Sequence, residues 1–593
     1  MKKFATVLLG VMLIIGFSGC SQKESGESTG GIKNGTYTST VKGNNAEITL
    51  EVQVKDSKIE SAKVTNHSET PVLSDGAIND IHAQVVETQS LAIDTISGAT
   101  VSSTAVLLGI ENCLTEAGFS IDDLKAKKGE IKKEEDKTID TDVLVIGAGG
   151  AGLSAAVTAN QEGAKVVVVE KMPKVGGNTI LAGGALNAVD EGSETAKKHK
   201  DSVELHFKQT YEGGNKKGDP KLVRILVNNA YSAIKWLKDL GMEFKPDTFT
   251  VLGGLWPRAH KPVEPVGTGF FKTFNNYITT HENIEVLLET KAEELIITDG
   301  VVKGIIASGK TGNKITINAK NVIIATGGFS KNIEMRQKYN TLWENLGENI
   351  KSTNHPGATG DGITLGLQAN ADLVGMEYIQ LLPMGDPKTG SLSGNIEMAV
   401  ENRIFVNKEG KRFVDEGARR DVMTAALMQQ QDSQLWVIVD SHDYPTGEEV
   451  NNFNEKLNDL IKEGRAFKGD SLNDLAKAIN VNPENLNKAV ESFNKFVRGE
   501  IKDEFGRTLK DREINKGPFY AALRVPTVHH TMGGLKINEN AEVIDKNGNV
   551  INHLYAAGEV TGGIHGENRL GGNALADIIV FGRIAGKNAA ANK

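Results

Sequence analysis

Apolar and polar positions alternate along residues 35–64, in runs such as Thr-Tyr-Thr-Ser-Thr-Val and Glu-Ile-Thr-Leu-Glu-Val-Gln-Val. A period of two is typical of strands that bury one face. Helical periodicity follows near 78–88 and again over 101–117. The pattern predicts a small α+β domain over residues 35–125, and a charged run poor in apolar residues at 126–139 predicts a linker after it.

The pattern changes at Thr141, where the continuous apolar run Val-Leu-Val-Ile at 143–146 predicts a buried strand. Strand and helix patterns then alternate to the C-terminus, without internal repeats. Glycine-rich sequence in 140–378 returns in 530–593, whereas 379–529 lacks it. We therefore expect one α/β domain built from the first and last of these segments, split by an inserted α+β lobe.

A glycine motif follows the first strand of this domain. It reads Gly-Ala-Gly-Gly-Ala-Gly ahead of a predicted helix over 153–161, so that Gly147, Gly149 and Gly152 permit a tight turn and a close approach of backbone to a pyrophosphate. A second strand ends at Glu170, at about the 20-residue separation where such a motif places an acid for ribose hydroxyls. The arrangement predicts a Rossmann-type dinucleotide site.

Further glycine-rich passages favour FAD over NAD as the dinucleotide. They occupy residues 171–179, 182–184, 325–328 and 359–362. A long flavin dinucleotide needs backbone contacts far beyond the first turn, and an acid at the ribose favours an unphosphorylated one. The chain is therefore predicted to hold FAD along an extended cleft.

The N-terminus has the pattern of an export signal. Lys2 and Lys3 precede an apolar run at 4–17, which is too short for a comfortable membrane span. Small residues just before Cys20 resemble a bacterial lipobox, so residues 1–20 are interpreted as a lipoprotein signal, with lipid on Cys20 and a polar tether at 21–34. The expected location is the extracellular face of the cell membrane; the alternative is a plain signal peptide with an incidental cysteine.

Composition narrows the chemistry further. The formal net charge is −9, which is unlike the footprint of a nucleic-acid-binding protein. With Cys20 and Cys113 as its two cysteines, the chain has no disulfide framework and no Cys-x-x-Cys-His site for a haem of the c type. We expect no metal site either, so any electron relay on this chain must use another cofactor.

Four motifs of the α/β domain are specific enough to indicate a family. They are Gly-Gly-Asn-Thr at 176–179, Phe-Val-Asp-Glu-Gly-Ala-Arg-Arg-Asp at 413–421, His-His-Thr-Met-Gly-Gly at 529–534, and the glycine-rich run at 558–575 that contains Gly-Glu-Asn-Arg-Leu-Gly-Gly-Asn-Ala-Leu. On these motifs, residues 140–593 resemble the soluble fumarate reductase family of flavoproteins, which includes flavocytochrome c fumarate reductases and urocanate reductase.

The resemblance implies a role for each matching residue. Arg420 matches the arginine that delivers a proton to the substrate, and His529 and Arg569 match the pair that grips a substrate carboxylate. Backbone contacts to the substrate match Gly184 and Gly572. The remaining matches are flavin contacts: Ala151, Glu170, Asn178, Thr179, Gly183, Gly184, Ala292, Asp361, His530, Glu559, Ala574 and Leu575. Covalent members have a histidine near the position of Asn178, so the FAD is expected to be noncovalent.

The same residues can be argued from chemistry. A double bond conjugated to a carboxylate accepts hydride at its β carbon only if the negative charge that builds toward the carboxylate is stabilised, which Arg569 and His529 can do as fixed donors. Arginine is a weak acid, so Arg420 needs a dry site and neighbours that reprotonate it; the alternative for an arginine here is a surface ion pair. Candidate neighbours by proximity in sequence are Asp415, Glu416, Arg419 and Asp421.

A second cofactor is predicted by the run Asp-Thr-Ile-Ser-Gly-Ala-Thr at 94–100. With this run, residues 35–117 resemble the FMN-binding domain whose threonine is joined to FMN through a phosphoester. The resemblance implies covalent FMN on Thr100, a flavin transferase that attaches it, and a membrane or extracellular electron-transfer chain as donor. The alternative is an ordinary helix N-cap by Thr100 or Ser102.

The substrate is narrowed by two departures from the fumarate-reducing pattern. Leu382 stands where those members have a histidine before a proline, and residues 394–398 lack their Thr-Glu pair. A second carboxylate facing Leu382 would be desolvated without a partner. A substrate with one carboxylate is therefore favoured. Urocanate fits if Glu397 accepts a hydrogen bond from its imidazole N–H. A cinnamate-like aryl acrylate fits if Leu186 and Leu382 line an apolar far end.

These observations predict an α/β protein with a Rossmann-type FAD-binding domain, split by an inserted α+β capping lobe, and a small N-terminal α+β FMN-binding domain. The predicted function is extracellular reduction of the C=C bond of an α,β-unsaturated carboxylate in anaerobic respiration, with urocanate first and aryl acrylates or fumarate as alternatives. A flavin electron shuttle is the non-enzyme alternative, although a shuttle needs no carboxylate grip, and an oxidase would run the reaction backwards.

Overall fold

The computed structural model describes residues 31–592, apart from 44–45, 70–73, 96–99 and 128–132. The predicted signal sequence and Cys20 lie outside these residues. Within the described ranges, no helix is both long enough and apolar enough to cross a membrane.

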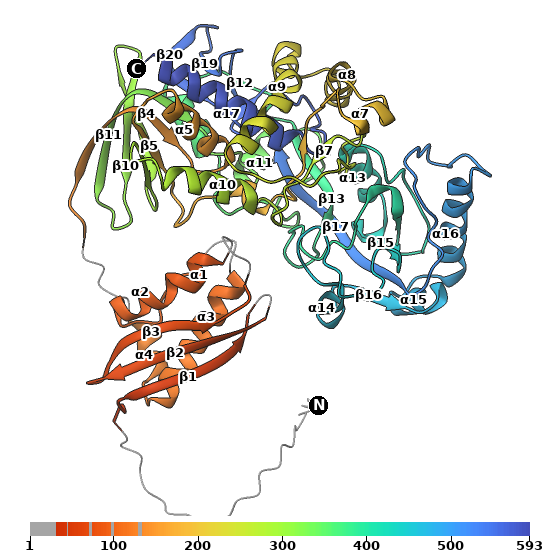
Figure 1. Ribbon diagram of the computed structural model, residues 1–593, viewed down its shortest axis with the longest axis horizontal. Helices are drawn as coiled ribbons and strands as arrows, with labels where there is room; N and C mark the ends of the chain where they lie inside the picture. Colours follow the sequence, from red (N-terminus) through yellow and green to blue (C-terminus); the bar gives the residue numbers. More distant parts are fainter. Residues whose placement is uncertain (1–30, 44–45, 70–73, 96–99, 128–132, 593) are drawn as a thin grey trace, which may run out of the picture.

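The first part of the chain forms a small domain, drawn in red and orange in Figure 1. Its three strands pair antiparallel in the order β1-β2-β3. Ile48, Leu50 and Val52 alternate along β2 and are fully buried in one cluster with Val106 and Leu114 of helix α3. The elements are β1 (Gly35–Lys42), β2 (Glu47–Lys55), β3 (Lys58–Asn66), α1 (Asp75–Asn79), α2 (Ile81–Thr88), α3 (Thr100–Glu116) and α4 (Ile121–Ala126).

The helical stretch expected near 78–88 differs in detail from this, because the structure divides it at Asp80 into α1 and α2. The helix expected at 101–117 is α3, which begins one position earlier, at Thr100. These are shifts at element ends, where local sequence signals are weakest.

An eight-stranded sheet forms the centre of the α/β domain. Its main path runs β19-β20-β11-β4-β5-β8, with β10 paired to β11 and β9 to β10. The four inner pairings, from β20 to β8, are parallel. The strands are β4 (Lys137–Ile146), β5 (Val166–Val169), β8 (Ile284–Leu287), β9 (Lys291–Thr298), β10 (Val301–Ser308), β11 (Lys314–Ile324), β19 (Glu542–Ile544) and β20 (Val550–Ala556).

Strand β4 begins at Lys137, inside the charged run that separates the two patterns of the sequence. Lys137 to Ile139 pair with Ile315 to Ile317 of β11, so the neighbouring strand lengthens β4 beyond its apolar part. The core of the α/β domain then forms around the four apolar residues at 143–146, which are all buried.

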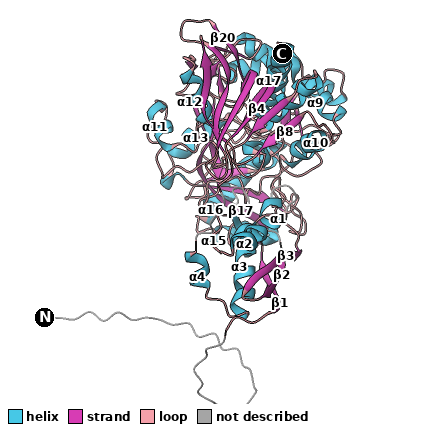
Figure 2. Cartoon of the chain, turned by 90° about the vertical axis from the view of Figure 1, so that its left-hand side faces the viewer, coloured by secondary structure: helices cyan, strands magenta, loops and turns pink. Residues whose placement is uncertain are grey.

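Helices α5 and α17 pack side by side against this sheet (Figure 1), and Figure 2 shows α17 next to β4 and β20 in the turned view. A Cβ atom on Gly586 would lie 2.2 Å from the carbonyl oxygen of Ala155, so a glycine is needed where the two helices approach. The helices of the domain are α5 (Gly150–Gln161), α6 (Gly177–Leu181), α7 (Glu194–His199), α8 (Val203–Gly213), α9 (Pro220–Asp239), α10 (Thr268–Ile278), α11 (Ile333–Tyr339), α12 (Asp361–Gln368) and α17 (Asn573–Ala591). Short strands complete it: β6 (Leu186–Asn187), β7 (Ala259–His260), β12 (Leu373–Val374), β18 (Gly534–Lys536) and β21 (Thr561–Gly562).

The inserted lobe is built on a second sheet, in the order β13-β17-β15-β14 with β16 on β17. Strand β17 is long, and Figure 1 shows it running from the lobe back toward the α/β domain, where it ends in the histidine pair. The strands are β13 (Ile379–Gly385), β14 (Ile404–Val406), β15 (Leu435–Asp440), β16 (Phe467–Gly469) and β17 (Phe519–Thr531). The helices are α13 (Arg420–Met428), α14 (Leu457–Lys462), α15 (Leu472–Ala478) and α16 (Pro483–Arg498), with 3-10 turns at Val400–Asn402 and Gln431–Ser433.

Candidate active site

The glycine motif forms a tight turn between β4 and α5. Gly147 has φ +105°, and a Cβ atom there would lie 2.5 Å from the carbonyl oxygen of Ala325. A Cβ atom on Gly152 would lie 1.8 Å from the carbonyl oxygen of Gly147, whereas one on Gly149 would meet nothing within 4 Å. The turn is therefore closed toward the protein and open at the N-terminus of α5, where free N–H groups can face a pyrophosphate.

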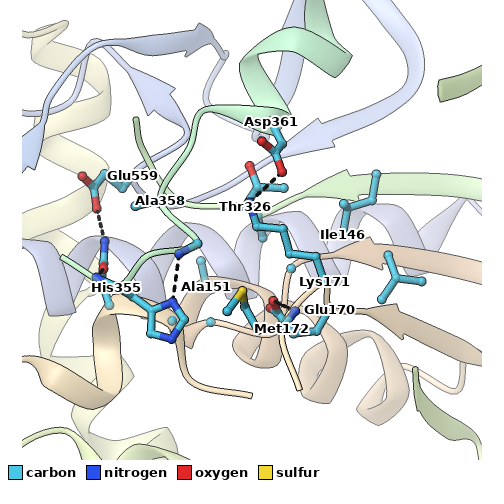
Figure 3. A pocket seen from close by; sticks show the side chains of 18 of the residues that line it. Ile146, Ala151, Glu170, Lys171, Met172, Thr326, His355, Ala358, Asp361 and Glu559 are labelled. Atoms are coloured by element: carbon cyan, nitrogen blue, oxygen red, sulfur yellow. Dashed lines mark hydrogen bonds and ion pairs between the residues drawn. The ribbon is translucent and has the colours of Figure 1, made fainter. Parts of the chain in front are cut away.

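Glu170 lies beside this turn, at the end of β5. Its carboxylate accepts hydrogen bonds from the backbone N–H groups of Ala148 and Met172, both at 2.9 Å. Burial raises the pKa of Glu170, and the two hydrogen bonds oppose the shift. Across the cavity, Lys171 pairs with Asp361 at 2.7 Å (Figure 3). The acids at 170 and 361 thus line one cavity of about 110 Å³.

Nine of the residues expected to contact the dinucleotide line this first cavity. They are Gly147, Gly149, Ala151, Glu170, Asn178, Thr179, Ala292, Asp361 and Glu559. A second cavity of about 200 Å³ is lined by another set from the predictions: Gly183, Gly184, Leu382, Glu397, Arg420, His529, His530, Arg569, Gly572, Ala574 and Leu575. Gly152 lines neither cavity, because it packs under the turn.

The two cavities share the residues Asn178, Thr179, Glu559 and Ile578, so they form one elongated cleft. Asn178 donates to Glu559 at 3.3 Å and accepts from the backbone N–H of His355 at 2.7 Å (Figure 3). His530 lines the second cavity and is buried. Its Nε2 has no partner among the described residues. The open turn and this unpaired nitrogen fit FAD: the N-terminus of α5 would hold its pyrophosphate, and residues of the second cavity would hold its flavin ring.

Arg420 and Arg569 meet at one amide oxygen in the second cavity. Nη1 of Arg420 and Nη2 of Arg569 donate to Oε1 of Gln380, at 3.3 and 3.2 Å. The Nε2 of Gln380 donates to the carbonyl oxygen of Arg569 at 2.8 Å, which fixes the orientation of the amide. Gln380 is not among the site residues predicted from the sequence. Its signal is that it is the polar residue of the otherwise apolar run 379–384, and the structure buries it.

Neither arginine has an ion-pair partner among the described residues. Burial lowers the pKa of Arg420 well below its usual range, and Arg569 lowers it further, whereas Glu397 opposes the shift. Burial also lowers the pKa of Arg569, to about 10. Two desolvated cations that lack carboxylates form a binding site for an anion.

His529 completes the anion site as a neutral imidazole, which donates from Nε2 in the tautomer whose Nδ1 accepts from Thr353. Its Nδ1 lies 2.8 Å from the hydroxyl of Thr353, which leaves Nε2 free for a ligand. Burial, followed by the charges of Arg420 and Arg569, lowers the pKa of His529 well below its usual range. The imidazole is therefore uncharged at neutral pH.

Glycines let Arg420 enter the cavity. A Cβ atom on Gly253 would lie 2.6 Å from Cγ of Arg420, and one on Gly571 would lie 3.0 Å from its guanidinium. The Nε of Arg420 donates to the carbonyl oxygen of Leu252 at 3.0 Å. Two segments far from Arg420 in the chain, at 252–253 and 571, thus fix its side chain, which no local pattern could show.

Three of the four neighbours proposed to reprotonate Arg420 form ion pairs elsewhere, and the fourth, Asp415, accepts from the backbone N–H of Gly417. Arg419 and Asp421 pair with each other at 2.6 Å, and Glu416 pairs with Arg412 and Arg507. No described carboxylate is within ion-pair distance of Arg420, and its closest acid in electrostatic terms is Glu397. Adjacency in the sequence was misleading because Arg420 begins α13 and its neighbours turn away from the cavity.

The far end of the second cavity differs from the expectation in two respects. Leu382 lines it, but Leu186 does not, because β6 pairs with β7 and buries that side chain elsewhere. Glu397 lines the cavity, yet one of its oxygens pairs with the buried guanidinium of Arg403. The other side chains that line the second cavity are mainly apolar, among them Phe249, Val251, Leu252, Met384, Leu392, Met398, Val400 and Phe453.

The predicted FMN attachment falls at the limit of the described chain. Thr100 is the first residue of α3, while its side chain and residues 96–99 lie outside what the structure describes. Ser102, one turn into this helix, hydrogen-bonds to Glu69 rather than capping the helix end.

Comparisons with known proteins agree with this architecture. The FAD binding domain family matches residues 142–575, and the FMN-binding domain family matches residues 43–115. Urocanate reductase of Eggerthella lenta is 36% identical over 99% of this chain and 98% of its own length. NADH:acrylate oxidoreductase of Vibrio harveyi is 38% identical over 94% of this chain, which spans 61% of the length of that protein.

Among solved structures, the open conformation of a flavocytochrome c3 fumarate reductase matches with a TM-score of 0.60 and 33% identity, over 77% of this chain and 78% of that one. The predicted fold class and the two predicted cofactors are therefore confirmed. The chain belongs to the family of FAD-dependent oxidoreductases that includes urocanate reductase and the flavocytochrome fumarate reductases, with an FMN-binding domain on the N-terminal side of its FAD-binding domain.

Proposed function

We propose that this protein reduces the C=C bond of an α,β-unsaturated carboxylate that has a single carboxylate group. The observation that carries the proposal is the anion site formed by Arg420, Arg569 and neutral His529, which faces a mainly apolar far end. A flavin shuttle has no use for two buried cations without partners, because desolvating them lowers stability unless a ligand anion offsets it.

Different side chains of the site have different roles in such a reaction. FAD, when bound, supplies the hydride for the β carbon. Arg569 and His529 hold the carboxylate and stabilise the charge that builds on it. Arg420 then gives its proton to the α carbon, and its lowered pKa makes it a stronger acid than an exposed arginine.

We place urocanate first among the substrates. Its single carboxylate fits the anion site, and its uncharged ring fits the apolar wall that contains Leu382 and Met384. The relative from Eggerthella lenta, which aligns over its full length, is a urocanate reductase. The aryl acrylates are a second candidate because Arg403 already takes one oxygen of Glu397 and aromatic residues line the same end.

The substrate is tested with a panel of acids and a reduced viologen dye as electron donor. We expect kcat/KM to be at least about tenfold higher for urocanate or cinnamate than for fumarate, since a second carboxylate at Leu382 would lose its hydration without gaining a partner. Acrylate tests whether the ring contributes to binding at all. A preference for fumarate would contradict the single-carboxylate proposal.

We also propose that the enzyme acts outside the cell, anchored by lipid on Cys20, in anaerobic respiration. FMN joined to Thr100 by a flavin transferase would pass electrons from a membrane or extracellular chain toward FAD, which is held without a covalent bond. The support is the lipobox-like sequence, the motif at 94–100 and the FMN-binding domain match. Both attachment points are tested below.

A further inference from the structure

Lys261 is a cation of the second cavity that the proposed reaction does not use. It follows β7, is half-buried, and lines the cavity together with Phe249 and Phe453. Its Nζ donates to Oδ1 of Asn452 at 2.9 Å, and no described carboxylate lies within ion-pair distance. Burial lowers the pKa of Lys261 to about 8, and the charge of Lys245 adds to the shift.

Asn452 holds this lysine at a defined place. Its Nδ2 donates to the carbonyl oxygens of Glu397 and Met398, at 2.9 and 3.2 Å. The amide oxygen is therefore committed to Lys261. Because Asn452 belongs to the inserted lobe and Lys261 to the FAD-binding domain, the ammonium lies between the two, next to the segment that carries Glu397.

Lys261 and the anion site line the same cavity but have different hydrogen-bond partners, Asn452 for the lysine and Gln380 for the two arginines. Arg569 lowers the pKa of Arg420, and both lower that of His529, whereas Lys261 responds to burial and to Lys245. An ammonium has three donor hydrogens, and the described residues engage one of them. A desolvated donor without a partner is unfavourable, so an acceptor atom from a ligand would stabilise it.

We propose that Lys261 selects substrates that carry a hydrogen-bond acceptor at the end opposite their carboxylate, such as a ring nitrogen or a phenolic oxygen. This inference rests on the proposed function, which places the carboxylate at the arginines. A neutral imidazole has one donor and one acceptor nitrogen. Glu397 can accept a hydrogen bond from the donor nitrogen, and Lys261 can donate one to the acceptor nitrogen. Together the two side chains can therefore bind both nitrogens of the ring.

The test uses ligands that differ by one atom. Cinnamate is compared with 3-(pyridin-3-yl)acrylate and 3-(pyridin-4-yl)acrylate, in which a ring nitrogen replaces a C–H group. Dissociation constants are measured at pH 7 from the change in flavin absorbance of the oxidised holoenzyme, so the readout does not depend on turnover. The variant is Lys261→Met, and the matched control is Lys245→Met, which removes an exposed lysine outside the cavity.

We expect at least one pyridyl acrylate to bind the unmodified enzyme more tightly than cinnamate does. In Lys261→Met this preference should fall roughly 10- to 100-fold, the range for a hydrogen bond to a charged group, while cinnamate binds unchanged or better. Lys245→Met should keep the preference. In the unmodified enzyme the preference should also weaken above pH 8, as Lys261 loses its proton.

Two outcomes would overturn the inference. Equal weakening of all three ligands in Lys261→Met would make the lysine a link between the lobe and the domain instead of a ligand contact. The absence of any pyridyl preference in the unmodified enzyme would exclude an acceptor site. Tight binding with the expected preference but without reduction by viologen would instead count against the proposed reaction and leave the role of Lys261 standing.

Discussion

Arg420 is the residue whose environment departs most from its ordinary chemistry. It is buried beside a second arginine, it donates to neutral oxygens of Leu252 and Gln380, and it begins α13, where the helix dipole disfavours a cation. Burial beside Arg569 and the position at the start of the helix favour loss of its proton, whereas the two donated hydrogen bonds oppose it. A guanidinium in this setting can act as an acid, whereas a surface arginine cannot.

The first prediction concerns proton delivery. Arg420→Lys keeps a positive charge but changes the geometry of the donor, and the two residues are not interchangeable at a positioned site. We expect kcat to fall by about 10²- to 10⁴-fold, the range for loss of a general acid, with FAD content unchanged. Steady-state kinetics with the best substrate and the flavin absorbance of the purified variant measure both. A kcat within a few-fold of the unmodified enzyme would remove Arg420 from the role of acid.

The second prediction concerns Leu382 at the far end. Leu382→His places a donor where the apolar wall now stands, and it should raise kcat/KM for fumarate relative to urocanate. The gain should be modest, because the Thr-Glu pair of fumarate-reducing members is still absent from 394–398. The ratio of the two kcat/KM values is the measurement, and Leu392→His, at another lining position, controls for polarity alone. An unaltered ratio would show that position 382 does not decide the substrate.

At the scale of elements, strand β17 and helices α5, α13 and α17 position the site. The C-terminal end of β17 carries His529 into the cavity, α13 starts with Arg420, and α17 follows directly after Gly572. Since these elements belong to both the lobe and the FAD-binding domain, the site exists only where the two meet.

The third prediction addresses the contact between α5 and α17. Gly586→Val puts a branched side chain where the oxygen of Ala155 lies 2.2 Å from a Cβ position. Overpacking of this kind reduces the free energy of unfolding by about 1–3 kcal/mol, which for a part of the chain this large lowers Tm by about 1–3 °C. Thermal unfolding followed by circular dichroism measures it, with the exposed Lys587→Ala on the same helix as control. Equal Tm values for the two variants would mean that the helices separate easily.

At the scale of the whole molecule, the chain combines two cofactor domains, which form the two ends of the proposed electron path. The small domain has its own sheet and core beside the FAD-binding domain (Figure 1), and it follows an N-terminus with the sequence of an export signal. FMN on this domain would relay electrons without a haem, for which the chain has no attachment motif.

The fourth prediction is that Thr100 carries FMN. Protein co-expressed with a flavin transferase should gain the mass of FMN, and Thr100→Ala should lose it while FAD is retained. Turnover with the physiological membrane donor should then fall, whereas turnover with a viologen that reduces FAD directly should persist. Thr115→Ala, a threonine at the other end of α3, serves as the control. Native active protein with an unmodified Thr100 would refute the attachment.

The fifth prediction is that the mature protein begins at a lipidated Cys20. Unmodified protein should partition into detergent, because an acyl chain gains about 0.8 kcal/mol for each buried CH₂ group. Cys20→Ala should stay in the aqueous phase, and Cys113→Ala, which alters a buried cysteine of the small domain, should partition like the unmodified protein. If all three proteins remain in the aqueous phase, the prediction of a lipid on Cys20 is wrong.

The sequence by itself determined the parts of this protein that depend on short-range order. The turn at Gly147, the acid at Glu170 and the alternating strands of the small domain are local patterns, because backbone geometry requires particular residues at fixed spacings. The motifs that contain Arg420, His529 and Arg569 likewise indicated the family and the site residues.

Only the tertiary structure decided how those residues are paired. The amide of Gln380 between two arginines, the burial of Leu186 away from the cavity, the engagement of Glu397 by Arg403 and the placement of Lys261 all involve segments distant in the chain. The pKa values of the two arginines and of Lys261, and the donors that these side chains leave free, depend on burial and on the distance between charges. Those quantities arise when the lobe folds against the FAD-binding domain, so no pattern within one segment contains them.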